Sequence, residues 1–500
     1  MCLTILSVCA AETVTPEMVT QAKKDIFSNK TSEEEKSAAL QLLKKGADES
    51  LAEAEYWYAW MRFYGKGGLP SDKKEAYRYF CAAAEKNHPL GLFWVGFYHA
   101  KGFIFDKDPV KAFEYLKKSA DTGRTDIMHR FAMECFSGQN FPADLKTGIR
   151  YLERAAEKNH APSVYQLGRC YFRGRGVKRD RKMAFSLYCR AADLGYAEAQ
   201  YQAAMSSFFR RGTRRNQDLE FKYFSKAAAQ GHVLAIYRTG NCYYFGFGVK
   251  QDFKKALQFF HHAALKGNPD SMTQIGYCYF RGFGVPQNLP ESVKWYERAA
   301  EKKDESAYLQ LARCYYSGVG VKKDLKKSWY YFDLIEKGQN ETMKRIIASE
   351  IAVFYEKGVV VEQNDEMAFY YNNRAWTNAG RIKAGIALMT GKGTPVSFAA
   401  ALEKFNAAVK NSSSPLGAFF AGSLYISGRN GVPLDVVKAE QLLTLSAEAG
   451  YVPAMKLLAK LYKDGTQNFP MNHTLSRKWA NAAQRAPVKN NEDFIGSPHR

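Results

Sequence analysis

Residues 234–269 read LAIYRTGNCYYFGFGVKQDFKKALQFFHHAALKGNP. Two segments of helical length flank a short loop at 245–251, and Asp252 stands where the second helix should begin. An Asp side chain in this position can accept hydrogen bonds from the free N–H groups of the first helical turn. Gly267 and Pro269 then end the segment, because Gly tolerates a left-handed cap and Pro cannot continue a helix. The stretch predicts a helical hairpin.

The same cap recurs along the chain. Steps of 36 residues from Asp252, followed by four unequal steps near the C-terminal end, reach an Asp, Asn or Ser every time. The twelve positions are Asp72, Asp108, Asp144, Asp180, Asn216, Asp252, Asn288, Asp324, Asn364, Ser397, Asp435 and Asn472. Such a period is the signature of repeat arrays, whose units pack only on their neighbours. The sequence predicts an all-α fold, a right-handed alpha-alpha superhelix (solenoid) of about twelve helix-pair repeats.

Each predicted second helix carries a regular packing pattern. Four residues after the cap stands Ala, Gly or Ser, and the only exception is Glu220. A large residue usually stands seven after the cap, and offsets 4, 7 and 11 share one helical face. We expect this face to pack against its neighbours, with the large residue between layers.

The predicted first helices also repeat. A small residue recurs in mid-helix, as at Gly168, Gly240 and Gly276, which indicates close approach to the paired helix. A second glycine should end each first helix in a left-handed cap. These predicted terminators are Gly102, Gly138, Gly174, Gly246, Gly282 and Gly318.

The sequence predicts four parts of the chain besides its regular repeats at 51–338. Residues 1–11 read MCLTILSVCAA, which is typical of a clipped signal segment, and the alternative is an apolar N-terminal strip. An exported location, periplasmic or secreted, is therefore favoured over the cytoplasm. Residues 12–50 should form an N-terminal cap with a half-repeat helix, 339–486 irregular repeats with a bend, and 487–500 a polar tail.

The net charge of the chain indicates which classes of partner it favours. Lys and Arg number 72 against 50 Asp and Glu, a formal net charge of +22. Such a balance favours anionic partners, namely nucleic acid, anionic lipid, acidic glycans or acidic proteins. A solvated basic surface is the alternative. No later run approaches the ~20 apolar residues of a membrane span, so no transmembrane segment is expected.

The nine cysteines do not suggest a framework of disulfide bonds. Four of them share one repeat position and should be small buried residues: Cys170, Cys242, Cys278 and Cys314. Cys170 and Cys189, which lie within one repeat, remain a disulfide candidate.

The combined pattern A-x-x-x-L-G-x-x-Y-x-x-G-x-G-V-x-x-D resembles the Sel1-like repeat family, a relative of the tetratricopeptide repeats. The resemblance covers about residues 52–485. In one repeat it is carried by Leu167, Gly168, Tyr171, Gly174, Gly176, Val177 and Asp180. It implies a protein–protein interaction scaffold or adaptor, TPR-like and without catalysis. Cysteine-rich relatives carry a cysteine pair per repeat, which this chain lacks. A hydrolase acting on cell-wall or beta-lactam substrates is kept as an alternative.

Motifs for other chemistry are missing from the sequence. No Gly-Lys-Ser/Thr follows the Gly-x-Gly loops, and neither Cys-x-x-Cys nor a Gly-x-Ser-x-Gly nucleophile elbow occurs. His261 and His262 have no second ligand cluster. We predict no catalytic residue, no cofactor and no metal site.

Two surfaces are candidates for binding. Relatives line their concave face with first helices, and a polar and aromatic stripe there should contact a protein or peptide, unless it is an ordinary solvated face. Its members are Gln166, Arg169, Arg173, Arg238, Asn241, Tyr277, Arg281 and Arg313. Two basic loops in adjacent repeats should form one patch for an anionic ligand. Its members are Arg175, Lys178, Arg179, Arg210, Arg211, Arg214 and Arg215. No recognition helix is evident, so specific DNA binding is not predicted.

Overall fold

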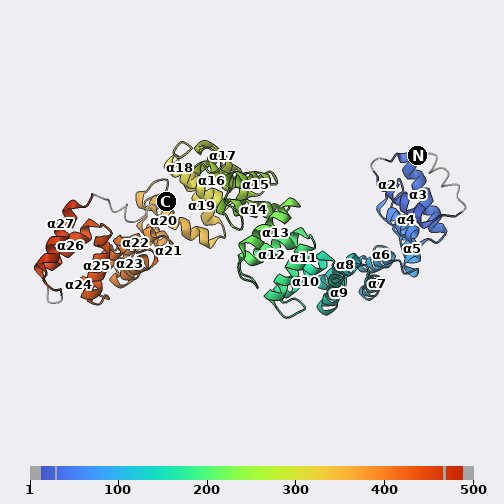
Figure 1. The fold of residues 1–500 in the computed structure, drawn as a ribbon, viewed down its shortest axis with the longest axis horizontal. Coiled ribbons are helices and arrows are strands. Elements are labelled where there is room, and N and C mark those ends of the chain that lie inside the picture. The colour runs from blue at the N-terminus through green and yellow to red at the C-terminus, as the bar shows by residue number, and fades with distance from the viewer. Residues whose placement is uncertain (1–12, 29–30, 466–468, 488–500) are drawn as a thin grey trace. The chain divides into compact units, whose positions relative to one another are not determined.

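The computed structural model describes residues 13–28, 31–465 and 469–487, so the predicted signal segment at 1–11 lies outside the described residues. The described chain consists of 26 α-helices, α2 to α27, joined by short loops and without a β-strand (Figure 1). The predicted all-α solenoid of helix-pair repeats is confirmed. No helix in the described ranges has the length and apolar character that crossing a bilayer requires.

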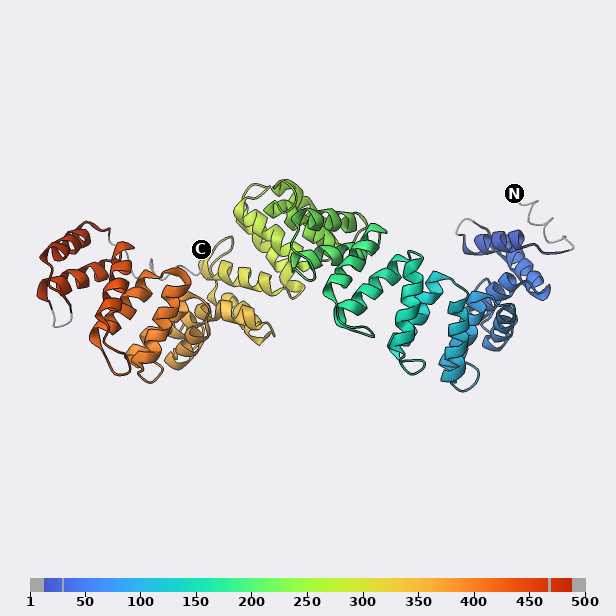
Figure 2. The ribbon, with the colours of Figure 1, turned by 60° about the horizontal axis from the view of Figure 1, so that its bottom comes forward.

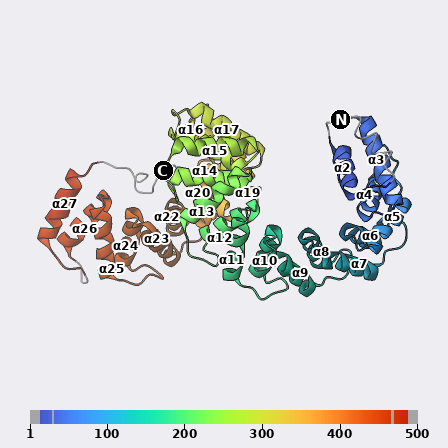
Figure 3. The ribbon, with the colours of Figure 1, turned by 45° about the vertical axis from the view of Figure 1, so that its right-hand side comes forward.

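The chain divides into two compact units, Met1–Asp252 (unit 1) and Phe253–Arg500 (unit 2). Figure 3 shows the succession of helix pairs in unit 1 most clearly, from α8 to α12. The helices of unit 1 are α2 (Pro16–Phe27), α3 (Glu33–Asp48), α4 (Ala52–Tyr64), α5 (Lys73–Glu85), α6 (Pro89–Lys101), α7 (Pro109–Asp121), α8 (Thr125–Ser137), α9 (Leu145–Glu157), α10 (Ala161–Arg173), α11 (Arg181–Asp193), α12 (Ala197–Phe208), α13 (Gln217–Ala229) and α14 (Val233–Phe245).

Unit 2 continues the same alternation of helices, which Figure 2 shows in yellow-green through orange to red. Its helices are α15 (Phe253–Leu265), α16 (Pro269–Arg281), α17 (Leu289–Glu301), α18 (Glu305–Ser317), α19 (Leu325–Lys337), α20 (Glu341–Lys357), α21 (Asp365–Arg374), α22 (Asn378–Thr390), α23 (Phe398–Ser412), α24 (Pro415–Ser427), α25 (Val436–Glu448), α26 (Val452–Asp464) and α27 (His473–Arg485).

The N-terminal end of the array differs from the prediction. The capping box of Ser32 and Glu35 does open α3, but α3 is not a lone half-repeat. It packs against α2, which begins after the capping residue Thr15. The two helices bury Val19 and Leu43 completely. Because the hydrophobic strip of α3 needed a partner, a complete helix pair forms here.

The predicted capping of the second helices is confirmed in eleven cases. In each of them the side chain of the capping residue accepts a hydrogen bond from a backbone N–H of the first turn, which stabilises a helix by about 1 kcal/mol. These residues are Asp72, Asp108, Asp144, Asp180, Asn216, Asn288, Asp324, Asn364, Ser397, Asp435 and Asn472.

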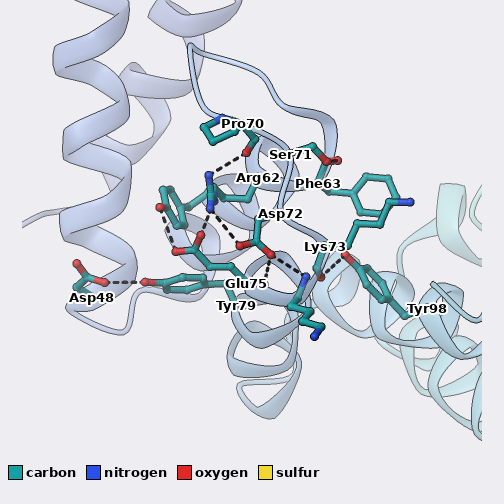
Figure 4. Close-up of polar contacts among 12 residues, drawn as sticks. Asp48, Arg62, Phe63, Pro70, Ser71, Asp72, Lys73, Glu75, Tyr79 and Tyr98 are labelled. Atoms are coloured by element: carbon teal, nitrogen blue, oxygen red, sulfur yellow. Dashed lines mark hydrogen bonds and ion pairs between the residues drawn. The ribbon is translucent and has the colours of Figure 1, made fainter. Parts of the chain in front are cut away.

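Hydrogen bonds within a repeat and between successive repeats are built around these caps (Figure 4). Asp72 accepts from the N–H groups of Lys74 and Glu75 at 2.9 Å and is paired with Arg62 at 3.4 Å. The Tyr79 hydroxyl, seven residues after the cap, donates to Asp48 of α3 at 2.8 Å. Tyr79 therefore links α5 to α3, the preceding second helix, through its hydroxyl, and Tyr151 and Tyr223 at the same offset do so by donating to Asp121 and Asp193.

The position eight residues after the cap, which the sequence pattern did not single out, forms the centre of the core. Phe80, Phe224, Phe260 and Tyr296 at this offset are all at most 2% exposed. A Cβ added at Gly276 would lie 2.6 Å from the Tyr296 ring, so the mid-helix glycine makes room for the aromatic ring of the paired helix. The predicted close approach of paired helices is confirmed.

The unequal spacing of the capping residues after Asp324 is accommodated by changes in helix length. Helix α20 has 17 residues instead of the usual 13, an excess of about one turn, and α21 has only 10. Within unit 2, α19 and α20 make the sparsest contact of any consecutive helices. The boundary between the two compact units lies earlier in the chain than this irregular segment, at Asp252 and Phe253.

The loops carry the contact between one repeat and the preceding one. In several loops a second glycine has a positive φ and lies over the first residue of the preceding second helix. A Cβ at Gly248 would lie 2.1 Å from the Gln217 carbonyl oxygen, and one at Gly393 would lie 2.1 Å from that of Asp365. Only glycine therefore fits these positions, for steric as well as conformational reasons.

A half-buried pair of histidines makes the stability of unit 1 sensitive to acid. His129 Nδ1 and His160 Nδ1 lie 3.1 Å and 2.8 Å from the hydroxyl of Ser163, which is buried. Burial, with a smaller contribution from the charge of His160, lowers the pKa of His129 to about 4. The unfolded chain, with an ordinary histidine pKa near 6.5, therefore takes up a proton as the pH falls below that value, while the folded chain does not.

We expect this histidine to cost unit 1 about 1 kcal/mol of unfolding free energy between pH 7 and pH 5, after allowing for solvent screening of a half-buried ring. Urea unfolding of the full chain at both pH values measures it. His129→Gln should reduce the loss, while His262→Gln, at an exposed position, should not. An equal pH dependence in all three proteins would contradict the assignment.

Candidate arginine–aromatic interface

The structure places the predicted partner stripe on the exposed side of the first helices. On α10, Gln166 and Arg169 are half-buried and Arg173 is exposed, and Arg169 Nη1 donates to Gln166 Oε1 at 3.2 Å. On α14, Arg238 and Asn241 are half-buried. These five residues belong to unit 1.

The remaining members of the stripe lie in unit 2 and are partly engaged there. Tyr277 is half-buried and Arg281 exposed on α16, with the Arg281 guanidinium 5.8 Å from the Phe283 ring. Arg313 of α18 is ion-paired with the buried carboxylate of Glu350 at 2.6 Å. Arg313 thus links α18 to α20, and its charge is already compensated within the array.

Three arginines of unit 1 lie beside phenylalanine rings near the C-terminal ends of α10, α12 and α14. Arg211 lies 4.6 Å from the ring of Phe209 and 5.8 Å from that of Phe172. The ring of Phe208 has two guanidinium groups near it, that of Arg215 at 5.0 Å and that of Arg238 at 5.5 Å.

Arg215 also lies 5.0 Å from Phe247 in the next loop. We call this set the arginine–aromatic surface: Arg211, Arg215, Arg238, Phe172, Phe208, Phe209 and Phe247. A guanidinium stacked on a ring is held in place with its N–H edge still able to bind a carboxylate. The surface therefore presents oriented donors beside exposed apolar area, since Phe209 is 47% exposed.

Glu220, the one exception in the packing pattern, anchors this surface. Its carboxylate is 1% exposed, where the eleven other repeats have Ala, Gly or Ser. It accepts from the Ser207 hydroxyl at 3.0 Å and lies 3.5 Å from Arg215 Nε. Burying a carboxylate is costly, and the regular array does not need one here. The Glu220 carboxylate holds the Arg215 side chain in place, 5.0 Å from the rings of both Phe208 and Phe247.

The predicted anion patch is brought together in part. Arg175 is committed to the preceding repeat, since its Nη2 donates to the Phe136 carbonyl at 2.6 Å. Lys178, Arg179, Arg210 and Arg214 are exposed, and no ion pair of theirs occurs among the described residues. The loop that contains Gly212 packs on Arg181, the first residue of α11, which directly follows the other basic loop.

The phenylalanine rings of the surface were missed in the sequence, because Phe is frequent at many repeat positions. The signal that could have found the surface was Glu220, a charged residue at a position otherwise reserved for small ones. Cys170 and Cys189 are free thiols, so the disulfide expectation is wrong. No group of three or more His, Cys, Asp or Glu in the described ranges could hold a metal ion.

Comparison with known proteins assigns the class. The Sel1 repeat model matches ten segments that cover most of the chain: 52–88, 89–123, 128–160, 161–196, 197–232, 233–268, 269–304, 305–334, 348–375 and 415–451. The chain belongs to the Sel1 repeat family. Helices α22, α23, α26 and α27 continue the array beyond the matched segments.

A solved structure shares the fold, and a second one is similar in sequence. A protective antigen of uropathogenic Escherichia coli with an SLR fold is 22% identical, covers 90% of this chain and 99% of its own, and has a TM-score of 0.70. A Sel1 repeat protein of Oxalobacter formigenes is 23% identical over 65% of this chain and 90% of its own, with a TM-score of 0.49. No curated protein matches the sequence. Sel1 repeats mediate protein–protein interactions, and proteins built from them generally act as scaffolds.

The anchoring role of Glu220 gives a second prediction. Glu220→Ala should change the unfolding free energy by less than about 1 kcal/mol, because Arg215 is 29% exposed and can turn to solvent instead of remaining buried without a partner. Urea unfolding measures this. A loss above about 3 kcal/mol would show that the carboxylate is needed for the fold and would remove the argument for a positioning role.

Proposed function

We propose that this chain is a non-catalytic interaction scaffold whose unit 1 binds an acidic segment of a protein partner at the arginine–aromatic surface. The observation that carries the proposal is the buried Glu220, which orients Arg215. Glu220 stands at a repeat position where stability alone favours a small residue. Arginine and aromatic side chains are also the residue types that contribute most binding energy at protein interfaces.

The chemistry of the surface defines the partner segment. Arg211 and Arg238 offer paired N–H donors to carboxylates, whereas Arg215 adds only its Nη1 group because its Nε and Nη2 are buried. Stacking leaves all three side chains little rotamer freedom to lose on binding. Phe209 offers apolar area to a partner side chain. The preferred segment should therefore carry Asp or Glu beside an aromatic or aliphatic residue, and the net charge of +22 should speed its association at low salt.

Selection from a random peptide display library against the full chain tests the proposal. Enrichment of peptides with several Asp or Glu and at least one large apolar residue is expected. The selected peptides should lose affinity when Glu220 is replaced by Ala, because Arg215 is then no longer held in place. Enrichment of basic or uncharged peptides, or peptides that bind the variant equally well, would contradict it.

A further inference from the structure

A hollow of about 530 Å³ opens at the start of α11, on unit 1. Arg179, Asp180, Arg181 and Lys182 line it from the loop and the first turn of α11, and Gly212 lines it from the loop that follows α12. The hollow thus joins two successive repeats. None of these residues belongs to the arginine–aromatic surface defined above.

The close packing of two loops creates this hollow. Gly212 has a φ of +87°, and a Cβ on it would lie 2.0 Å from the Arg181 carbonyl oxygen and 3.0 Å from the Lys182 nitrogen. The backbone of the second loop therefore rests directly on the first turn of α11.

The charges around the hollow are strongly unbalanced. Segments 173–182 and 210–215 carry ten basic side chains and one carboxylate, that of Asp180. Arg179, Arg181 and Lys182 are exposed, and within the described ranges they form no ion pair. Asp180 accepts from the backbone N–H groups of Lys182 and Met183 at 2.8 Å and 3.0 Å, so its carboxylate serves the helix.

Like charges gathered from two loops repel one another, and an anion between them removes the repulsion. Two features indicate an anion of more than one charge. Several cations converge on the hollow without a neutralising partner, and arginine forks match the oxygens of a tetrahedral oxyanion better than point charges do. Because Asp180 already occupies the N–H groups of the first turn, recognition falls to the side chains.

We propose that this hollow binds a phosphate monoester carried by a protein segment, that is, a phosphorylated side chain of the partner. A phosphorylated side chain carries about −1.5 to −2 charges at pH 7 and three acceptor oxygens, whereas a carboxylate carries one charge and two oxygens. The hollow is open to solvent, so residues that flank the phosphorylated side chain can lie across it. The choice of a protein as the source rests on the proposed function.

The test is binding of the full chain to peptide arrays that differ at one central residue, phosphoserine, serine or glutamate, in otherwise random sequence. Phosphoserine peptides should be retained at least tenfold more strongly than both other sets. The double variant Arg181→Glu with Lys182→Glu should abolish this phosphate-dependent gain. It should leave the fold intact, because acidic residues are favourable in a first helical turn.

The matched control is Lys323→Glu with Lys326→Glu. These lysines flank Asp324 in an equivalent repeat and are exposed, and the loop that follows, 358–363, contains no arginine. This control should keep the phosphate-dependent gain. Equal retention of phosphoserine and glutamate peptides, or a gain that persists in the Arg181 and Lys182 variant, would overturn the proposal.

Two further outcomes separate this inference from its alternatives. A 12-nucleotide single-stranded RNA that binds more tightly than the phosphopeptides, and is lost with the same double variant, would assign the hollow to nucleic acid and overturn the proposal. Loss of the phosphate-dependent gain with unchanged binding of the unphosphorylated acidic peptides would support it. That pattern shows that the hollow acts separately from the arginine–aromatic surface.

Discussion

The double variant Arg211→Glu with Arg238→Glu is expected to bind the selected acidic peptides at least 100-fold more weakly than the natural chain. The reason is that two oriented donors become two carboxylates facing a carboxylate ligand, so attraction is replaced by repulsion of the partner. A 100-fold loss corresponds to about 2.7 kcal/mol, within the range for charged groups at interfaces. Fluorescence anisotropy of a labelled peptide measures the affinity.

The control for this prediction is Arg78→Glu with Arg298→Glu. These exposed arginines also stack on rings, at 5.1 Å from Tyr79 and 4.5 Å from Trp295, but they lie on second helices. The control changes the net charge equally and removes similar cation–π contacts. Comparable losses of affinity in both variants would show that only the total charge matters, and the assigned surface would be wrong.

Gly212→Ala is expected to destabilise unit 1 by about 2–5 kcal/mol. An alanine there adopts a left-handed backbone, which costs about 1–2 kcal/mol, and its Cβ would lie 2.0 Å from the Arg181 carbonyl oxygen. That oxygen belongs to a helix and cannot move alone, so the loop has to lift away from α11. The transition assigned to unit 1 in chemical denaturation measures the loss.

The variant Gly195→Ala separates the cost of the left-handed backbone from the cost of the steric clash. Gly195 has a φ of +91° and nothing within 4 Å of an added Cβ, so only the cost of the left-handed backbone applies. We expect this control to lose about 1–2 kcal/mol. If Gly212→Ala were no more destabilising than Gly195→Ala, the loop would not rest on α11 as described, and the hollow would lose its structural basis.

The candidate site could be predicted from the sequence only in part. The arginines were evident as two basic clusters, and Glu220 was evident as an exception to a pattern. Its role was not, because nothing local to residue 220 indicates that Ser207 and Arg215 are its partners. Likewise, Arg313 has the spacing of an exposed stripe residue, but its pairing with Glu350, 37 residues later, depends on how successive repeats stack.

The sequence by itself determined the class of fold, the repeat period, the helix starts at the capping residues and the helix ends at the glycines. These features depend on interactions within a few residues, such as Asp180 with the first turn of α11, and a local pattern records them. Tertiary structure alone decided that α2 completes the N-terminal pair, that Gly212 rests on Arg181, and which arginines stack on Phe208. Those contacts join residues of different helices, and they form only when the surfaces of neighbouring repeats meet.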